Sequence, residues 1–229
     1  MDIYFCALPT AALTAAEAAG EAALRKEACL ARLPEERRRE TLCASLLARR
    51  CVSALTGERE VRFSRGPRGK PLCAGGWCSA SHSGGLAAAC AAAEPVGLDV
   101  ERLRAVPSRL LRALTAGESA FVRAGEAGWE GRFWRLWTMK EALLKCRGDG
   151  VGAVRKTELL PQTLTAASGE AFPGWPQSEE TAPLPADGAV RTLASLPLWT
   201  LPGRPGYGFA LPAAPAGWCM SLCLRLSEG

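Results

Sequence analysis

Hydrophobic and polar positions divide the first part of the chain into helices and then strands. Residues 10–31 are rich in alanine and have high helix propensity, and a second helix is predicted over residues 35–55. Residues 56–73 contain glycine, proline and basic residues and are predicted to form a strand, a turn and a loop. Residues 78–104 predict two short strands around a turn at residues 94–95.

The second part of the chain begins with helical periodicity and ends with strands. Residues 108–146 are predicted to be helical, with a break near the glycines of residues 125–131. Proline and glycine recur over residues 161–215 and predict loops and short strands. The segments YGFAL (207–211) and WCMSLCLRL (218–226) are predicted to be the last strands. This mixture predicts an α+β fold, and the change in composition is consistent with two halves.

Composition limits the class of protein. The chain has 229 residues, of which 48% are hydrophobic, so a core can be buried. No apolar run is long enough for a membrane helix, and residues 1–10 lack a basic segment followed by a long apolar stretch. We therefore expect a cytoplasmic protein with no export signal and no membrane contact.

The ten cysteines do not suggest a disulfide framework. They are scattered along the chain, contain no Cys-x-x-Cys pair, and in several cases lie inside apolar runs. Buried, reduced cysteine acting as a small hydrophobic residue is the favoured interpretation. A zinc site is not expected, because His82 is the only histidine and no ligand spacing fits. In its Ser/Gly setting, His82 is interpreted either as an exposed turn residue or as part of an anion-binding loop.

The formal net charge is +5, and basic residues cluster at 37–39, 49–50 and 62–70. Any one cluster is explained by a solvated face, but three clusters in the first third of the chain suggest an anionic partner. Nucleic acid is one candidate. It is disfavoured because aromatic residues are not interleaved with these clusters, as a stacking surface for bases would require.

The sequence VGLDVE at residues 96–101 alternates between apolar and polar positions. Its three aliphatic side chains share one face of a predicted strand, and Gly97, Asp99 and Glu101 share the other. Asp99 and Glu101 would lie roughly 6.5–7 Å apart along the strand. The plain interpretation is a strand edge with two solvated acids. The alternative is a site for a hard divalent cation such as magnesium, which carboxylate oxygens suit.

A predicted helix over residues 132–150 carries three charged residues near its apolar face. Lys140 falls inside the apolar arc, and Glu141 and Lys145 lie together at its edge. A surface Glu–Lys pair at this spacing is common and contributes only about 0.2–0.5 kcal/mol. It does not explain Lys140, which must reach out of the arc or meet an anion. One acid and two lysines in a partly desolvated place indicate a site that holds metal and phosphate together.

The order of four motifs resembles a known family. GKP at 69–71, SHS at 81–83, GLDVE at 97–101 and WTMKEALLKCRGDG at 137–150 together resemble the Sfp-type 4'-phosphopantetheinyl transferases. The resemblance extends from about residue 35 to residue 150. Each motif is weak alone, but four in order at family-like spacing form a specific signal.

The resemblance implies a fold and a reaction. The fold would be pseudo-two-fold, with an N-terminal half (1–103) and a C-terminal half (104–229). Each half would be a helix packed on an antiparallel sheet, with the coenzyme A and metal site in the cleft between them. The reaction would transfer 4'-phosphopantetheine from coenzyme A to a serine of an apo carrier protein and release 3',5'-ADP.

The resemblance also implies roles for residues. Magnesium, with manganese as the alternative ion, would be held by Asp99, Glu101 and Glu141. The expected catalytic residues are Asp99, Glu141 as general base, and Lys145, which would stabilise charge on the phosphates. Glu118 resembles a further acidic position of the family. The residues expected to contact coenzyme A are Lys70, Ser81, His82, Lys145, Arg37 and Arg38. Its 3'-phosphate could be held by Arg37, Arg38, Arg39 or Arg49.

The expected partner is an acidic carrier protein of fatty acid, polyketide or nonribosomal peptide synthesis, and the enzyme is expected to be a monomer. Two alternatives remain open. One is a nucleic-acid-binding module that uses the basic clusters, and it leaves Asp99, Glu101 and Glu141 unexplained. The other is a catalytically silent relative that binds coenzyme A or a carrier without transfer.

Overall fold

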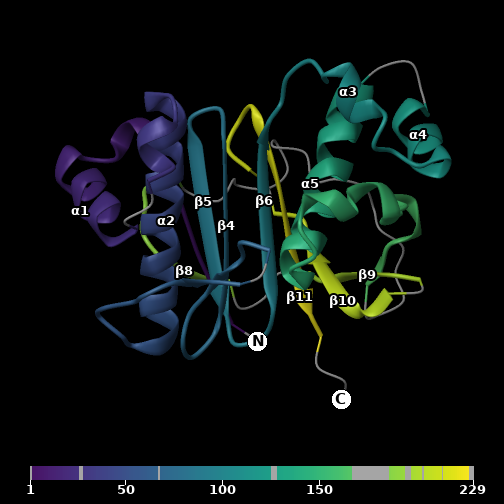
Figure 1. The fold of residues 1–229 in the computed structure, drawn as a ribbon. Coiled ribbons are helices and arrows are strands. Elements are labelled where there is room, and N and C mark those ends of the chain that lie inside the picture. Colours follow the sequence, from purple (N-terminus) through teal and green to yellow (C-terminus); the bar gives the residue numbers. More distant parts are fainter. Residues whose placement is uncertain are drawn as a thin grey trace.

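The computed structural model describes residues 2–25, 28–66, 68–124, 128–166, 186–193, 197–202, 204–212 and 214–226. Two antiparallel sheets form its centre, and a long helix covers each of them (Figure 1). The first sheet has the order β4-β5-β1-β8 and is formed by β1 (Ile3–Pro9), β4 (Trp77–Ser83), β5 (Leu86–Ala92) and β8 (Arg191–Leu193). The second has the order β6-β11-β10-β9-β7 and is formed by β6 (Val96–Arg102), β7 (Thr165–Ala166), β9 (Trp199–Leu201), β10 (Arg204–Ala210) and β11 (Trp218–Arg225).

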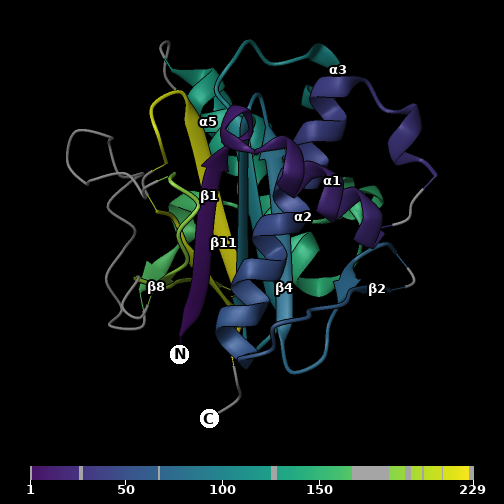
Figure 2. The same ribbon diagram turned by 90° about the vertical axis from the view of Figure 1, so that its left-hand side faces the viewer.

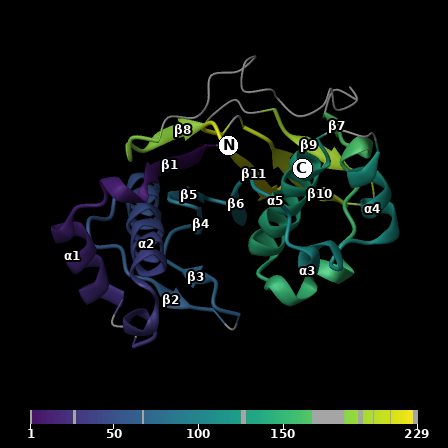
Figure 3. The same ribbon diagram turned by 90° about the horizontal axis from the view of Figure 1, so that it is seen from above.

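The helices flank these sheets. Helix α2 (Glu35–Thr56) packs on the first sheet, and α1 (Ala15–Arg25) lies against the outer side of α2 (Figure 2). Helix α5 (Trp129–Arg147) packs on β6 and β11 of the second sheet, on the same side of the strands as α2 (Figure 3). The short elements are η1 (Thr10–Ala12), η2 (Leu30–Arg32), the hairpin β2 (Ser64–Arg65) and β3 (Pro71–Leu72), α3 (Ser108–Leu111), α4 (Ala116–Arg123), η3 (Val151–Lys156) and η4 (Pro161–Thr163).

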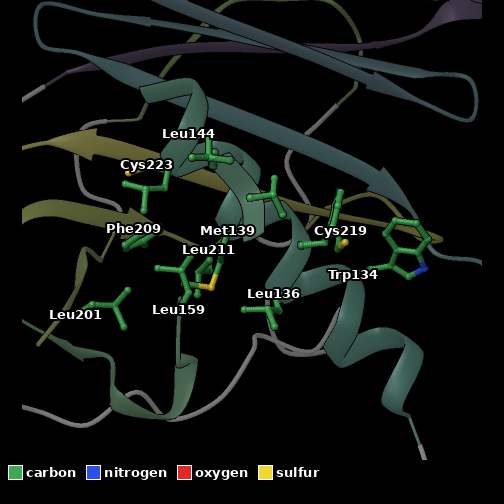
Figure 4. Packing of buried hydrophobic residues seen from close by; sticks show 14 of the residues in the cluster. Trp134, Leu136, Met139, Leu144, Leu159, Leu201, Phe209, Leu211, Cys219 and Cys223 are labelled. Atoms are coloured by element: carbon green, nitrogen blue, oxygen red, sulfur yellow. The ribbon is translucent and has the colours of Figure 1, made fainter. Parts of the chain in front are cut away.

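Three groups of buried apolar side chains hold these layers together. One lies between α2 and the first sheet, and a second lies between α5 and the second sheet, where Trp134, Met139, Phe209 and other side chains interdigitate (Figure 4). The third joins β1 and β5 to β6 and β11 and includes Phe5 and Leu98. This third group connects the two sheets, so their relative position is fixed by close packing.

Gly97 lets α5 approach β6 more closely than any side chain would permit. A Cβ atom at this position would lie 1.9 Å from the carbonyl oxygen of Ala142 and 2.5 Å from the backbone nitrogen of Cys146. The glycine in GLDVE therefore makes room for the backbone of α5 itself. The consequence is that side chains of α5 reach the acidic face of β6.

The predicted α+β class is confirmed, and most predicted elements are present. The helix predicted over residues 10–31 is shorter, because η1 precedes α1 and α1 ends at Arg25. Residues 78–104 contain three strands instead of two, with an additional turn at Gly84 and Gly85, which both have positive φ. The missed strand is β4, whose serine, alanine and histidine residues have weak strand propensity.

The predicted division at residue 103 falls just after β6. Across this point, β6 pairs with β11 in the second sheet, and β8 of the later chain completes the first sheet. The pseudo-two-fold relation of the halves stays a prediction. Part of the predicted loop region 161–215, including all of residues 167–185, lies outside the described residues.

The cysteine prediction is confirmed. All ten thiols are reduced, eight of them are buried, Cys73 is half-buried and Cys29 is exposed. Among the residues described, the structure has no helix that is long and apolar enough to span a membrane.

Candidate functional site

A cleft with a volume of about 420 Å³ is lined by α2 on one side and α5 on the other. The hairpin of β2 and β3 and the strand β4 complete its walls. Its cationic lining residues, which come from both parts of the chain, are Arg25, Arg49, Arg65, Arg68, Lys70 and Lys145. We refer to this feature as the basic cleft. His82 and Glu141 also line it.

Asp99 lies beside the cleft on β6 and is almost fully buried. Its Oδ1 atom accepts hydrogen bonds from the Lys145 ammonium at 2.6 Å and from the Ser81 hydroxyl at 2.7 Å. The same ammonium donates to Ser81 Oγ at 3.0 Å. Asp99 Oδ2 is buried without a hydrogen-bond partner. A buried, unpartnered carboxylate oxygen is costly, so this atom indicates a position suited to a further donor or a cation.

Serines of β4 connect this strand to β6, although the two strands belong to different sheets. Ser83 Oγ donates to Glu101 Oε2 at 2.6 Å and accepts from the Arg102 amide at 3.2 Å. Ser79 Oγ accepts from the Leu98 amide at 3.0 Å. The alternating serines therefore hold the acidic face of β6 against β4. The sequence analysis did not predict this row of serines. The spacing of serine at every second position could have indicated it, because such residues share one face of a strand.

Glu141 lies on α5 and lines the basic cleft. Burial, followed by the negative charge of Asp99, raises the pKa of Glu141 to about 7, and the charge of Lys145 opposes this rise. Burial and Asp99 also raise the pKa of Glu101, although its hydrogen bond with Ser83 acts in the other direction. The charge of Asp99 thus makes both Glu101 and Glu141 harder to ionise. A positive charge placed among them would relieve this repulsion.

Lys145 supplies positive charge at this point. Burial alone lowers its pKa, but the charges of Asp99, Glu141 and Glu101 outweigh that effect and raise it. The residues expected to hold a metal therefore act on one another and on Lys145. Within the described part of the chain, however, no three carboxylate, imidazole or thiol groups stand as a ready-made ligand cluster. The donor chemistry and the unpartnered Asp99 Oδ2 fit a hard divalent cation, while the ligand set itself stays a prediction.

His82 lies on β4, whereas its Ser/Gly setting suggested a loop. Its Nδ1 atom is 3.2 Å from Glu40 Oε2 and 3.4 Å from Arg37 Nη1. Burial, followed by the charge of Arg37, lowers the pKa of His82, and Glu40 opposes this. Arg37 therefore contacts a residue that lines the cleft. Arg38 forms an ion pair with Glu35 instead and is not among the residues that line the cleft.

Lys70 lines the cleft, but its ammonium faces the end of α5. It donates to the carbonyl oxygens of Lys145 at 2.5 Å, Cys146 at 3.0 Å and Val96 at 3.2 Å. Burial lowers its pKa. The lysine of the GKP motif thus connects the β2–β3 hairpin to both α5 and β6.

Lys140 does not take part in the cleft, which corrects the idea that two lysines of α5 meet phosphate. Its ammonium is completely buried on the side of α4, where it donates to both carboxylate oxygens of Glu118 at 2.7 and 2.6 Å. Glu118 also accepts from the amides of Thr115 and Leu159. Lys140 therefore meets an anion, as its place in the apolar arc required, but the anion is structural.

Comparisons with known proteins find related sequences. The family model of the 4'-phosphopantetheinyl transferase superfamily matches residues 95–175. The chain is 30% identical over 175 residues to the 4'-phosphopantetheinyl transferase HetI of Nostoc sp.. This match covers 70% of the present chain and 72% of HetI. It is also 32% identical over 153 residues to the 4'-phosphopantetheinyl transferase AcpT of Salmonella typhimurium. This second match covers 62% of the present chain and 76% of AcpT.

Proposed function

The chain belongs to the 4'-phosphopantetheinyl transferase superfamily, and we propose that it transfers phosphopantetheine from coenzyme A to a carrier-protein serine with the help of magnesium. Enzymes of this superfamily are transferases that act on carrier proteins with coenzyme A as substrate. The observation that carries the proposal is the contact of Lys145 with Asp99 and Ser81 beside the basic cleft. That contact brings a cation, an acid and a hydroxyl from three elements together where an anionic substrate would bind.

The charge of the cleft supports coenzyme A as its occupant. Coenzyme A carries a pyrophosphate and a 3'-phosphate, and the six cationic side chains of the cleft offer charge for both. Arg68 comes from the β2–β3 hairpin and Lys145 from α5, so two different elements offer charge to a bound phosphate. His82 and Arg37 form a further donor pair on β4 and α2. We assign the phosphate contacts to this set apart from Lys70, whose ammonium donates to three backbone carbonyl oxygens.

Asp99, Glu101 and Glu141 are proposed to hold the magnesium ion. The unpartnered Asp99 Oδ2 and the raised pKa values of Glu101 and Glu141, to which burial and the charge of Asp99 contribute, support this assignment. When bound, the ion would supply neutralisation of the pyrophosphate charge and of the charge that develops on the leaving group. Manganese is the alternative ion, because its preference for oxygen ligands is similar.

The residues of the chain then have distinct tasks in the transfer. The serine oxygen of the carrier attacks the β-phosphorus of coenzyme A, and Glu141 accepts the serine proton. The bond from this phosphorus to the bridging oxygen breaks, and 3',5'-ADP leaves with that oxygen. Lys145 lies beside Asp99 and donates to the phosphate oxygens as negative charge moves to the leaving group. Phosphoryl transfer depends mainly on such positioning and charge stabilisation.

Both walls of the cleft come from one chain, which supports a monomer as the active form. The carboxylates beside the cleft would repel a nucleic-acid backbone, so the basic lining is better explained by a small anionic substrate that binds together with a cation. The chain retains both Glu141 and Lys145, which argues for turnover in preference to silent binding of coenzyme A.

The test is a transfer assay on a panel of apo carrier proteins with coenzyme A and magnesium, read by mass spectrometry. We expect one serine to gain the mass of a phosphopantetheine arm, and the gain to disappear when EDTA is added. Asp99→Asn, which keeps the shape of the side chain, should abolish transfer. Glu60→Ala removes an exposed acid that precedes the β2–β3 hairpin and should leave transfer unchanged. Full activity of Asp99→Asn, or no transfer to any carrier, would contradict the proposal.

A further inference from the structure

The Lys70 side chain is held by a tight turn and directed at the end of α5. The turn is closed by hydrogen bonds from the Gly66 amide to the Lys70 carbonyl at 2.9 Å and from the Gly69 amide to the Gly66 carbonyl at 2.9 Å. From there the ammonium reaches three carbonyl oxygens, those of Val96, Lys145 and Cys146. Two of these belong to the last turn of α5 and one to the first residue of β6.

An ammonium group has three N–H donors. The three carbonyl contacts account for all of them, so Lys70 has no donor left for a phosphate oxygen unless it releases a buried partner. Carbonyl groups in the last turn of a helix lack partners within the helix and carry the negative end of its dipole. A cation at this place is therefore favourable for reasons that involve no substrate.

The position of these carbonyls connects Lys70 to the candidate catalytic residues. One of them is the backbone carbonyl of Lys145 itself. Another is that of Val96, which precedes Asp99 by three residues on β6. A single ammonium thus ties the backbone at Lys145 to the strand that carries Asp99, beside the close contact of α5 with Gly97.

A second contact from the same hairpin supports this arrangement. Arg68 donates to the carboxylate of Asp149 at 3.2 Å and to the Gly148 carbonyl at 3.4 Å, just beyond the end of α5. This contact is exposed, whereas that of Lys70 is partly buried, so the Lys70 contact should dominate.

We propose that Lys70 is a positioning residue, which holds the last turn of α5 on β6 so that the Lys145 ammonium stays on Asp99, and that it does not bind substrate phosphate. The inference rests on the proposed function for its kinetic consequences but not for its structural ones. The inference assigns two tasks to the cations of the basic cleft. Some of them face the substrate, whereas Lys70 keeps α5 aligned on β6.

The kinetic test compares Lys70→Met and Lys70→Arg with wild-type protein in the carrier assay. A positioning role predicts that kcat falls about tenfold or more in both variants, because small displacements of catalytic groups are costly. The KM for coenzyme A should stay within about twofold of wild type. A phosphate ligand would behave differently: Lys70→Met would raise KM, and Lys70→Arg, which keeps a strong phosphate donor, would restore it. That second pattern would overturn the inference.

A matched control separates positioning from general effects. Lys156→Met removes an exposed lysine of η3 and should change neither kcat nor KM. All assays are run well below the melting temperature of each variant. Under those conditions a lysine that contributed only stability would leave kcat unchanged, and this result would also overturn the inference.

Hydrogen exchange provides a readout that does not depend on turnover. The amides of Gly148 and Asp149 both donate to the Leu144 carbonyl at the end of α5. We expect their exchange in Lys70→Met to be about tenfold or more faster than in wild type, with α2 unaffected. Unchanged exchange would refute the positioning role. If wild-type protein transfers nothing, the proposed function fails, and the exchange result still decides the role of Lys70.

Discussion

The contact of Gly97 with α5 makes the most direct prediction about stability and activity together. In Gly97→Ala, the new Cβ would lie 1.9 Å from the Ala142 carbonyl oxygen and 2.5 Å from the Cys146 nitrogen. Both neighbours are backbone atoms of α5, so no side chain can turn aside to make room. Restoring ordinary contact requires α5 and β6 to separate by about 1.5 Å along this direction.

The expected magnitude follows from this displacement. Overpacking a core costs about 1–3 kcal/mol, and a clash between two backbones should reach the upper end of that range. For a protein of this size, a loss of about 3 kcal/mol lowers Tm by roughly 6–12 °C. The same displacement moves Glu141 and Lys145 relative to Asp99, and a misplacement of about 1 Å can cost about 100-fold in rate.

The assay measures thermal unfolding and carrier modification on the same samples, with the rate taken at a temperature where the variant is folded. Gly20→Ala is the matched control, because Gly20 lies on α1 and nothing lies within 4 Å of the position that the added methyl group would take. That control should gain up to about 1 kcal/mol from helix propensity and keep full activity. If Gly97→Ala melts within about 2 °C of wild type and keeps full turnover, the close approach of α5 to β6 does not control the site.

Three further predictions concern buried groups. In urea unfolding, Lys140→Met should lose about 3–5 kcal/mol because Glu118 is left buried without its cationic partner, and adding Glu118→Leu should recover most of the loss; equal midpoints for the single and double variants would contradict this. His82 has a lowered pKa in the folded state, so the unfolded chain binds the proton more readily and stability should fall as the pH drops below 6.5. If the urea midpoint depends on pH in the same way in wild-type protein and in His82→Gln, this prediction is wrong. Of the ten thiols, Cys29 should react first with a thiol reagent in native protein, Cys73 more slowly, and the rest only after unfolding; rapid native reaction of all ten would show that the core packing is wrong.

The elements that carry the acids could be predicted because their patterns are local. The alternation of VGLDVE placed Asp99 and Glu101 on one strand face, and the helical periodicity placed Glu141 and Lys145 together, as β6 and α5 show. The contact between the two elements could not be read from periodicity. It depends on a glycine that admits a helix backbone, which is a property of the packed structure.

Partner choice was the harder part of the prediction. The sequence required an anion for Lys140 but could not select Glu118, whose Thr115 capping box gives no indication of what its carboxylate meets in space. The sequence could place Lys70 near the nucleotide only by resemblance, and the three carbonyls it contacts come from two distant elements. Local patterns fix which face a residue occupies, whereas tertiary packing decides which charge it meets.

The two sheets contribute different chemistry to the site. The first sheet and α2 supply the serine row and His82, and the second sheet and α5 supply the carboxylates and Lys145. Neither part alone contains both walls of the basic cleft and the acids. The hydrogen bonds from Ser81 and Ser83 to the acids of β6 cross this boundary, so the same bonds that join the sheets also orient the candidate metal-binding carboxylates. Changes that loosen the junction should therefore reduce turnover before they unfold the protein, because alignment across the boundary is lost at a smaller displacement than packing is.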